Sequence, residues 1–357
     1  MNLEDFGYNN KIDRFRKENN LDRSQIGRVI TEHRERYIVK TINSELEAEV
    51  TGNIRFTAKD REDFPAVGDW VTIITYGENY AIINDILPRS SIIKRRAAGK
   101  PGGVQVIATN VDYAFLVQSV DRDFNMNRLE RYLTICHSSG ISPIIILSKI
   151  DLVSEQRLSD ISGTIRKRIN DVRLIALSNL TKHGYEALSE SMVKGKTYCM
   201  LGSSGAGKST LLNNLSGREV MRTGEISDST RKGKHITSHR EMIIIKNGGI
   251  LIDNPGMREV GIADSEGGLE ITYNIIDETS LSCRYKDCTH THEAGCAVID
   301  AVERGFIERA SYDNYIKLKK EKDHFESTLA ERKKKEKDFG KIVKNYKKTM
   351  KKNRSGD

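Results

Sequence analysis

The sequence has no long apolar run, and this absence excludes a membrane-spanning helix. Its unbroken apolar runs reach only about five residues, as in Tyr113–Val117, whereas a spanning helix needs roughly 18–20. The first residues carry neither a basic head nor an apolar stretch, so no secretory signal is expected. Together these features predict a soluble, cytoplasmic protein without a membrane partner.

Cysteine is also scarce, and no internal repeat is found. Five cysteines in 357 residues are too few for a disulfide scaffold, so in a reducing compartment clustered cysteines indicate metal binding or chemistry. What the chain does have is enough apolar material, 37%, to exclude wholesale disorder. Its length suggests two or three domains.

The positive charge is concentrated at the C-terminal end. The formal net charge is +8, but residues 317–357 contain 16 Lys and Arg against 7 Asp and Glu. The rest of the chain is nearly neutral, with 42 basic and 43 acidic residues. This asymmetry indicates a polyanionic partner, with a solvated charged helix as the alternative.

The hydrophobic pattern divides the chain into five segments. They are a lead segment (1–20) that is helical or loose, a small β-barrel (21–95), an α/β domain (96–265), a cysteine-rich segment (266–315) and a basic helical tail (316–357). Short β runs at 27–30, 36–40, 50–55, 68–74 and 80–83 have the spacing of a barrel. Apolar strands at 113–118, 144–147, 172–177, 197–201, 242–245 and 250–252 alternate with helical stretches at 127–138, 155–169 and 208–216, which predicts a mostly parallel sheet.

A phosphate-binding loop is predicted after the strand at 197–201. The residues Gly202, Ser203, Ser204, Gly205, Ala206, Gly207, Lys208 and Ser209 match G-x-x-x-x-G-K-S. The glycines let backbone N–H groups turn toward phosphate oxygens, and the following helix adds positive potential. We expect Lys208 to act as a catalytic group on the β- and γ-phosphates and Ser209 to ligate Mg²⁺, with Thr210 beside it. A chance glycine-rich turn is the alternative.

A second motif is D-x-x-G at the end of the apolar strand 250–252. Asp253 is expected to contact Mg²⁺ through water, and the Gly256 N–H to sense the γ-phosphate. An ordinary turn after a strand is the alternative.

A guanine-reading motif is predicted upstream of the phosphate loop. Ser148, Lys149, Ile150 and Asp151 resemble the N-K-x-D motif of GTPases, in which the carboxylate accepts hydrogen bonds from guanine N1 and N2 that adenine cannot offer. Ser148 replaces the usual Asn, which we expect to remove an amide that braces the loop. Ser178 and Asn179 resemble the S-A turn whose backbone N–H reaches guanine O6, with Asn179 in place of Ala. A polar loop after a strand is the alternative for 148–151.

The motifs occur in a circularly permuted order. The base motif comes first, then the phosphate loop, then D-x-x-G, whereas ordinary GTPases begin with the phosphate loop. Domains tolerate such a permutation because their chain ends often lie close together. The segment after D-x-x-G leads into the cysteine-rich region, so we hypothesise that nucleotide state moves that region.

A tetrahedral zinc site is predicted in the cysteine-rich segment. Cys283, Cys288, His290 and Cys296 offer three thiolates and one imidazole within 14 residues, a closed and therefore structural set. His292 is a rival ligand, and a set of unrelated thiols is the alternative. Cys136 and Cys199 lie among apolar residues and are expected to be core thiols.

Over roughly residues 25–315 the sequence resembles the circularly permuted GTPases of small ribosomal subunit maturation, the ribosome small subunit-dependent GTPase A family. Besides the motifs above, it shares residues 27–30, 67–69, 87–89, 108–112, 131–133 and 253–259. The resemblance implies an N-terminal OB-fold that binds RNA, a P-loop GTPase domain and a zinc domain with one structural Zn²⁺. It further implies Mg²⁺-dependent hydrolysis of GTP to GDP, stimulated by the 30S subunit with its 16S rRNA, and favours His290 over His292. We expect a monomer.

The switch segment departs from the family. The usual G-x-H-T-T reads Gly-Lys-His-Ile-Thr over 233–237, and Thr237 is the candidate Mg²⁺-sensing hydroxyl. Met257 stands where many GTPases carry a water-orienting Gln, so we hypothesise that His235 is the second catalytic residue. The alternative for His235 is an exposed loop residue. On the barrel, Arg28, Tyr37 and Arg55 are candidate RNA contacts.

Three functions compete on the sequence alone. The first is a ribosome-assembly GTPase, the second a non-enzymatic RNA-binding module with a degenerate nucleotide site, and the third a metal-handling P-loop NTPase. Mg²⁺-dependent GTP turnover separates the first two. Tight zinc unaffected by nucleotide argues against the third.

Overall fold

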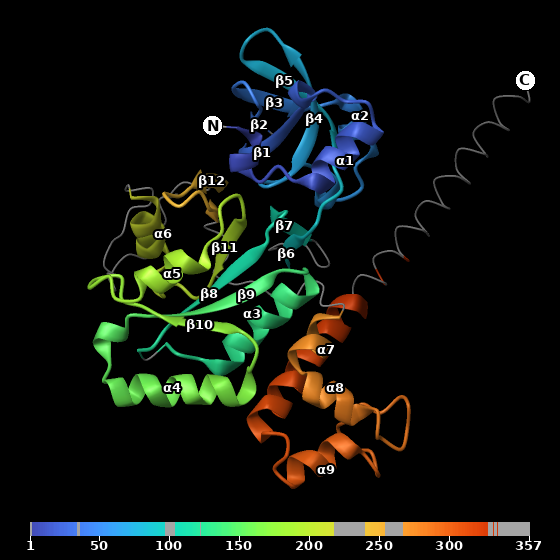
Figure 1. The fold of residues 1–357 in the computed structure, drawn as a ribbon. Coiled ribbons are helices and arrows are strands. Elements are labelled where there is room, and N and C mark those ends of the chain that lie inside the picture. Colours follow the sequence, from blue (N-terminus) through green and yellow to red (C-terminus); the bar gives the residue numbers. More distant parts are fainter. Residues whose placement is uncertain are drawn as a thin grey trace, which may run out of the picture.

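The computed structural model describes residues 2–33, 36–96, 104–121, 123–217, 240–253 and 267–327, together with residues 331 and 334. These residues form an N-terminal β-barrel, a central sheet flanked by helices and a C-terminal group of helices (Figure 1). Within this part of the chain, no helix is both long and apolar enough to cross a membrane.

The N-terminal strands close into a barrel. They are β1 (Ile26–His33), β2 (Arg36–Lys40), β3 (Glu45–Val50), β4 (Trp70–Tyr76) and β5 (Tyr80–Ile86). They pair in the order β1-β2-β3-β5-β4, and β4 pairs back to β1. Apolar side chains fill the interior: Val29, Tyr37, Val39, Leu46, Ala48, Val50, Val71, Ile73, Ala81 and Ile83. Five strands closed in this way agree with the expected OB-fold.

One predicted barrel strand is wrong. Residues 50–55 were expected to be extended, but Gly52–Thr57 forms helix α2, whose N-cap Thr51 accepts a hydrogen bond from the Ile54 N–H. The strand lies earlier, in β3, where small and apolar residues at alternate positions face the core. Its other positions are glutamates, so the strand has low hydropathy. Only the alternation of glutamates with small or apolar residues indicates a strand in the sequence.

The lead segment folds onto the barrel. It contains η1 (Leu3–Phe6) and α1 (Asn10–Glu18), so of the two possibilities left open the helix is present, and η2 (Arg23–Gln25) follows before β1. Asn9 caps α1 by accepting hydrogen bonds from the first-turn N–H groups. The rings of Tyr8 and Trp70 meet edge to face at 5.6 Å.

The central sheet holds the predicted alternation of strands and helices. Its elements are β8 (Tyr113–Ser119), α3 (Met126–Ser138), β9 (Ser142–Ser148), η4 (Ile150–Leu152), α4 (Glu155–Arg168), β10 (Arg173–Ala176), α5 (Tyr185–Ser191), β11 (Thr197–Leu201), α6 (Lys208–Ser216), β12 (Arg240–Ile244) and β13 (Ile250–Asp253). The order is β10-β9-β8-β11-β13-β12, parallel except for β12. The strand that leads into the phosphate loop, β11, is therefore central.

Each face of this sheet is covered by a different pair of helices. Leu116 on β8 belongs to the core that includes Leu129 of α3 and Ile161 of α4. Its neighbour Phe115 belongs to the other core, which includes Leu188 of α5 and Leu211 of α6. Successive strand residues thus serve opposite faces, as expected for a sheet buried on both sides.

The barrel and the central sheet are hydrogen-bonded to each other. Strand β12 pairs with β1, so the two sheets form one of eleven strands. Arg28 is buried at this junction, where its guanidinium donates to Phe6 O (2.5 Å), Gly68 O (3.1 Å), Asn110 O (3.2 Å) and Thr197 Oγ1 (3.0 Å). Burial lowers the pKa of Arg28 to about 10.

Two of the three candidate RNA contacts on the barrel are wrong. Arg28 and Tyr37 are only 1% and 2% exposed and serve the junction and the barrel core. Arg55 is exposed and pairs with Glu49 at 3.4 Å. The short η3 (Arg61–Asp63) lies between α2 and β4, and the hairpin of β6 (Ile92–Arg96) and β7 (Val104–Thr109) follows the barrel.

The C-terminal helices pack on α3. They are α7 (Gly268–Thr272), α8 (Asn274–Ser280), α9 (Ala297–Glu303) and a helical run over residues 309–327 (Figure 1). Buried Glu130 of α3 joins them, because its Oε2 accepts hydrogen bonds from Asn314 Nδ2 (2.6 Å) and Tyr273 OH (3.1 Å). Arg168 of α4 pairs with the same carboxylate at 2.6 Å.

Candidate nucleotide site and metal centre

The phosphate loop lies at the carboxyl end of β11 and continues into α6. Gly205 and Gly207 have φ of +80° and +89°, which only glycine adopts readily. Gly202 lies so close to β8 that a Cβ there would meet Val117 O at 2.3 Å. The motif glycines are therefore required by the backbone path, and Lys208 begins the helix.

Two neighbouring side chains hold the loop. The Lys208 ammonium donates to Gly202 O (2.6 Å) and Ser203 O (2.5 Å), which keeps it folded over the loop. The Ser203 hydroxyl donates to Asp123 Oδ2, and Arg128 pairs with the same carboxylate at 2.9 Å. Asp123 is a site residue that the sequence reasoning missed, since its only signal is its position just after a parallel strand.

The base motif sits beside the phosphate loop. Ser148 ends β9, is fully buried, and donates its hydroxyl hydrogen bond to Ala206 O at 2.7 Å. Asn179, after β10, donates its amide to Gly207 O at 3.0 Å. Position 148 therefore offers the loop no amide, but the Ser148 hydroxyl makes one contact with it and the Asn179 amide makes a second.

Asp151 is exposed at the mouth of this site, in η4. Lys149 precedes it in the left-handed region (φ +61°) and pairs with Asp121 at 2.9 Å. Burial raises the pKa of Asp121, but hydrogen bonds from Lys149, the Asp123 N–H and Ser119 outweigh it and lower the pKa overall. Asp121 is thus an ionised anchor that fixes the Lys149 side chain, and it is a second residue that sequence reasoning missed.

Ser178 shapes the second base loop. Its buried hydroxyl accepts hydrogen bonds from the N–H groups of Leu180 (3.2 Å) and Thr181 (3.1 Å), which closes a tight turn directly after Asn179. The structure therefore brings residues 148–151, 178–179 and 202–210 together at one end of the sheet.

Of the remaining predicted nucleotide-binding residues, only one lies within the part of the chain that the structure describes. Asp253 ends β13, next to β11 in the sheet, which is the position that its predicted role requires. His235, Thr237 and Gly256 lie outside the described residues.

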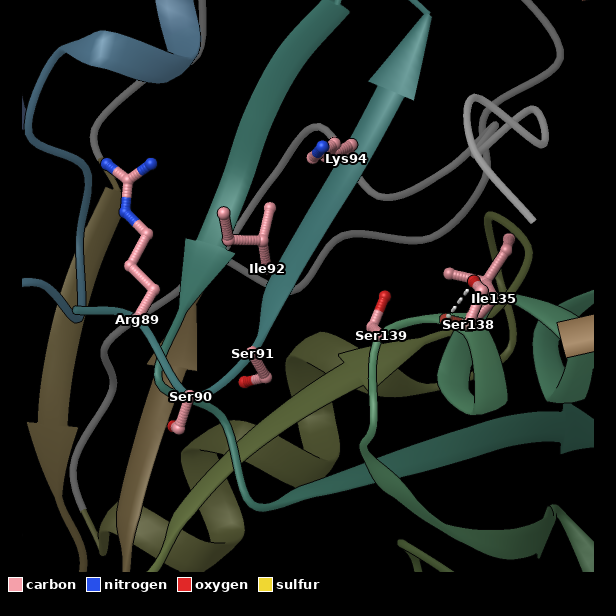
Figure 2. A pocket seen from close by; sticks show the side chains of 8 residues that line it. All are labelled: Arg89, Ser90, Ser91, Ile92, Lys94, Ile135, Ser138 and Ser139. Atoms are coloured by element: carbon pink, nitrogen blue, oxygen red, sulfur yellow. Dashed lines mark hydrogen bonds between the residues drawn. The ribbon is translucent and has the colours of Figure 1, made fainter. Parts of the chain in front are cut away.

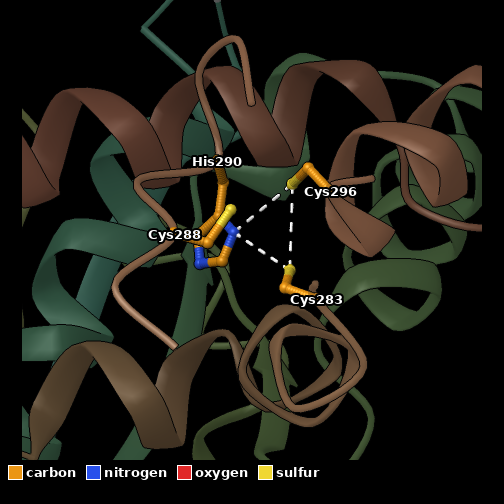
Figure 3. A group of neighbouring side chains, drawn as sticks. All are labelled: Cys283, Cys288, His290 and Cys296. Atoms are coloured by element: carbon orange, nitrogen blue, oxygen red, sulfur yellow. Dashed lines mark hydrogen bonds between the residues drawn. The ribbon is translucent and has the colours of Figure 1, made fainter. Parts of the chain in front are cut away.

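The predicted metal ligands converge (Figure 3). One ligand atom from each of Cys283, Cys288, His290 and Cys296 lies within 4.8 Å of the others. The Cys283 and Cys296 sulfurs are 3.9 Å apart, and His290 Nδ1 is 3.6 Å and 3.5 Å from them. Tetrahedral zinc, with bonds of about 2.3 Å to sulfur and 2.0–2.1 Å to nitrogen, places its ligands about 3.5–3.8 Å apart. The donor set therefore fits one structural Zn²⁺.

His290 rather than His292 completes the metal centre. His290 is 5% exposed, and its carbonyl accepts a hydrogen bond from Tyr312 OH at 2.5 Å. His292 is exposed, and its Nδ1 lies 2.8 Å from Thr291 Oγ1. Glu293 organises the loop by accepting hydrogen bonds from the backbone N–H groups of residues 289, 291 and 292.

A pocket of about 240 Å³ lies away from these residues (Figure 2). It is lined by the strand around Ile92 and the end of α3, and none of the predicted site residues borders it. One of its lining residues, Arg89, forms an ion pair with Asp69 at 2.6 Å and donates hydrogen bonds to two backbone carbonyls. The Arg89 guanidinium is therefore already paired with protein groups.

Comparison with known families finds relatives over most of the chain. The model of the RsgA GTPase family matches residues 86–263, and a model described as a 50S ribosome-binding GTPase matches residues 197–337. A Listeria monocytogenes protein named small ribosomal subunit biogenesis GTPase RsgA 2 is 41% identical over 322 residues, 90% of this chain and 89% of the relative. A Bacteroides thetaiotaomicron protein, named small ribosomal subunit biogenesis GTPase RsgA 1, is 37% identical over 97% of each chain.

Solved structures share the fold. YjeQ from Thermotoga maritima superposes with a TM-score of 0.62 at 24% identity, over 85% of this chain and 98% of that one. YloQ, described as a circularly permuted GTPase, superposes with a TM-score of 0.61 at 26% identity, over 84% and 95%. The permuted order expected from the motifs agrees with this likeness.

Proposed function

Because this chain belongs to the RsgA GTPase family, we propose that it hydrolyses GTP to GDP and phosphate in the late maturation of the small ribosomal subunit. The relatives over 90% or more of its length carry names that refer to biogenesis of that subunit. The chemistry takes place at the phosphate loop, and the subunit stimulates it.

One observation carries the nucleotide assignment. Two loops from the upstream half of the domain, at Ser148 and Asn179, are hydrogen-bonded to consecutive carbonyls of the phosphate loop. In our proposal the exposed Asp151 carboxylate accepts hydrogen bonds from guanine N1 and N2. A phosphate loop alone fits many nucleotides, whereas a carboxylate that accepts from guanine N1 and N2 favours guanine nucleotides.

The roles of the site residues follow from their positions. Backbone N–H groups at the start of α6 bind phosphate oxygens, Lys208 neutralises the charge that develops on them, and Ser209 in the first helical turn holds Mg²⁺. When bound, Mg²⁺ would be held by the Ser209 hydroxyl and would offset the negative charge of the phosphates. We assign Asp253 to contacting Mg²⁺ through water, Gly256 to sensing the γ-phosphate, Thr237 to Mg²⁺ and His235 to positioning water.

The proposed partners are the 30S subunit and its 16S rRNA. The closed barrel is of a type that binds oligonucleotides, and the predicted basic tail adds attraction for a polyanion. We further propose a cytoplasmic monomer, with the segment limits at 20, 95, 265 and 315 as its domain boundaries.

The test is phosphate release from GTP and from ATP, each with and without 30S subunits, and with 50S subunits as the matched control. We expect slow GTP turnover alone, faster turnover with 30S subunits only, and little ATP turnover. Absence of Mg²⁺-dependent GTP turnover in every mixture would contradict the proposal and leave the RNA-binding module. Equal stimulation by both subunits would contradict the assigned partner.

A further inference from the structure

We propose that Asn179 is a positioning residue that, with Ser148, sets the phosphate-loop peptides for binding the nucleotide's phosphates. This role differs from the backbone contact to guanine assigned to the same position, and it rests on the proposed GTP site. The side chain acts through the loop and does not touch the nucleotide.

Two side chains converge on one stretch of the phosphate loop. Ser148 Oγ donates to Ala206 O at 2.7 Å, and Asn179 Nδ2 donates to Gly207 O at 3.0 Å. A Cβ placed on Gly207 would lie 2.7 Å from Asn179 Nδ2 and 3.9 Å from Ser148 Oγ. Both donors therefore approach the loop on the same side of Gly207.

The direction of these bonds fixes the direction of the opposite peptide groups. A trans peptide is planar, so its N–H points away from its C=O. Holding the carbonyls of Ala206 and Gly207 toward the base loops turns the N–H groups of Gly207 and Lys208 to the other side. Those N–H groups belong to the motif whose backbone binds phosphate oxygens.

The Asn179 amide is itself held in one orientation. Its Oδ1 accepts a hydrogen bond from Tyr185 OH at 2.7 Å, which leaves Nδ2 to face Gly207. Asn214 Nδ2 donates to Tyr185 OH at 2.7 Å and to Asn179 O at 3.3 Å. Since Asn214 lies on α6, Asn179 is tied both to the beginning of that helix and to a later turn.

This arrangement has a consequence for the pair of positions 148 and 179. The amide that an Asn at position 148 would supply is here supplied from position 179, and the smaller Ser148 leaves room for it. An Asn at both positions would crowd Gly207, whereas an Asn at either one satisfies the loop. The two positions are therefore expected to be strongly non-additive.

The test is the affinity of GDP and of IDP, which lacks the guanine 2-amino group, for the full chain and four variants. We expect Asn179→Ala to weaken both nucleotides about tenfold, the loss of one well-formed hydrogen bond, with an unchanged GDP/IDP ratio. Asp151→Ala should instead remove the preference for GDP over IDP. Glu186→Ala, which changes an exposed residue of the neighbouring helix α5, is the matched control and should bind like wild type.

The fourth variant tests whether an Asn at position 148 can replace the Asn at position 179. Ser148→Asn combined with Asn179→Ala should restore GDP affinity to within about twofold of wild type. Unchanged affinity in Asn179→Ala, or a double variant weaker than Asn179→Ala alone, would overturn the inference. Thermal unfolding of each variant separates a misfolded chain from a weakened site. If wild type itself binds neither nucleotide, the proposed function fails rather than this inference.

Discussion

Side chains of the phosphate loop are held by hydrogen bonds to other protein groups. Lys208 donates to two carbonyls of its own loop, and Ser203 donates to Asp123. These contacts keep a positive charge and a set of N–H groups in place before substrate arrives. Such preorganised charge is the main protein contribution to phosphoryl transfer.

We expect Lys208→Ala to lower subunit-stimulated GTP turnover at least about 100-fold, because no other described side chain of the loop is cationic. Phosphate release measures the effect. Lys167→Ala, which changes an exposed lysine of α4, is the control. Comparable rates in both variants would show that Lys208 is not catalytic.

Asp151→Asn is expected to reverse the base preference. Asn at this position offers an amide donor to the 2-oxo group of xanthine and no longer accepts from the guanine 2-amino group. Affinity for GTP should fall by roughly 100-fold while affinity for XTP rises. Competition binding measures both. Asp160→Asn on α4 is the control, and an unaltered GTP preference in Asp151→Asn would place the base elsewhere.

At the scale of elements, the metal centre ties together the short helices of the C-terminal segment. The helices α7, α8 and α9 have five to seven residues each, too short to be stable alone. Four ligands from one loop and from the N-cap of α9 tie this segment together. Buried Glu130 then connects it to α3.

His290→Ala should reduce bound zinc from about one equivalent to nearly none, since three thiolates remain without the imidazole. His292→Ala, two residues away, should retain it. Metal analysis after dialysis decides between them. Full zinc in His290→Ala and loss in His292→Ala would reverse the ligand assignment. Chelation of wild type should lower the thermal midpoint as well.

At the scale of the whole molecule, the barrel and the GTPase sheet are one continuous sheet with a buried arginine at the junction. Arg28 donates hydrogen bonds to the lead segment, to the barrel, to Asn110 between β7 and β8, and to β11. Because β11 leads into the phosphate loop, the barrel's position is tied to the same strand that carries the nucleotide site. A displacement of the barrel would therefore act on the strand that leads into that site.

Arg28→Met should lower the free energy of unfolding by about 3 kcal/mol, because it leaves several buried carbonyls without a donor. Denaturant unfolding measures the change, and Arg36→Met, on the exposed part of β2, is the control. Equal stability of the two variants would mean that the junction does not depend on Arg28.

Local signals in the sequence determined much of this protein. The phosphate loop, the zinc ligands and most strands were predictable because neighbouring residues carry them: glycines at fixed spacing, cysteines within one loop and apolar runs. The strand β3 was missed because half of its residues are glutamates and only its alternation marks it.

Only the tertiary structure decided which distant side chains meet. Asn179 and Gly207 are 28 residues apart, Ser148 and Ala206 are 58, and Arg28 and Thr197 are 169. No local pattern encodes such a pair, because the distance between two side chains depends on how whole strands and helices pack. Sequence alone therefore named the loop that holds phosphate, and the folded chain showed which residues hold the loop.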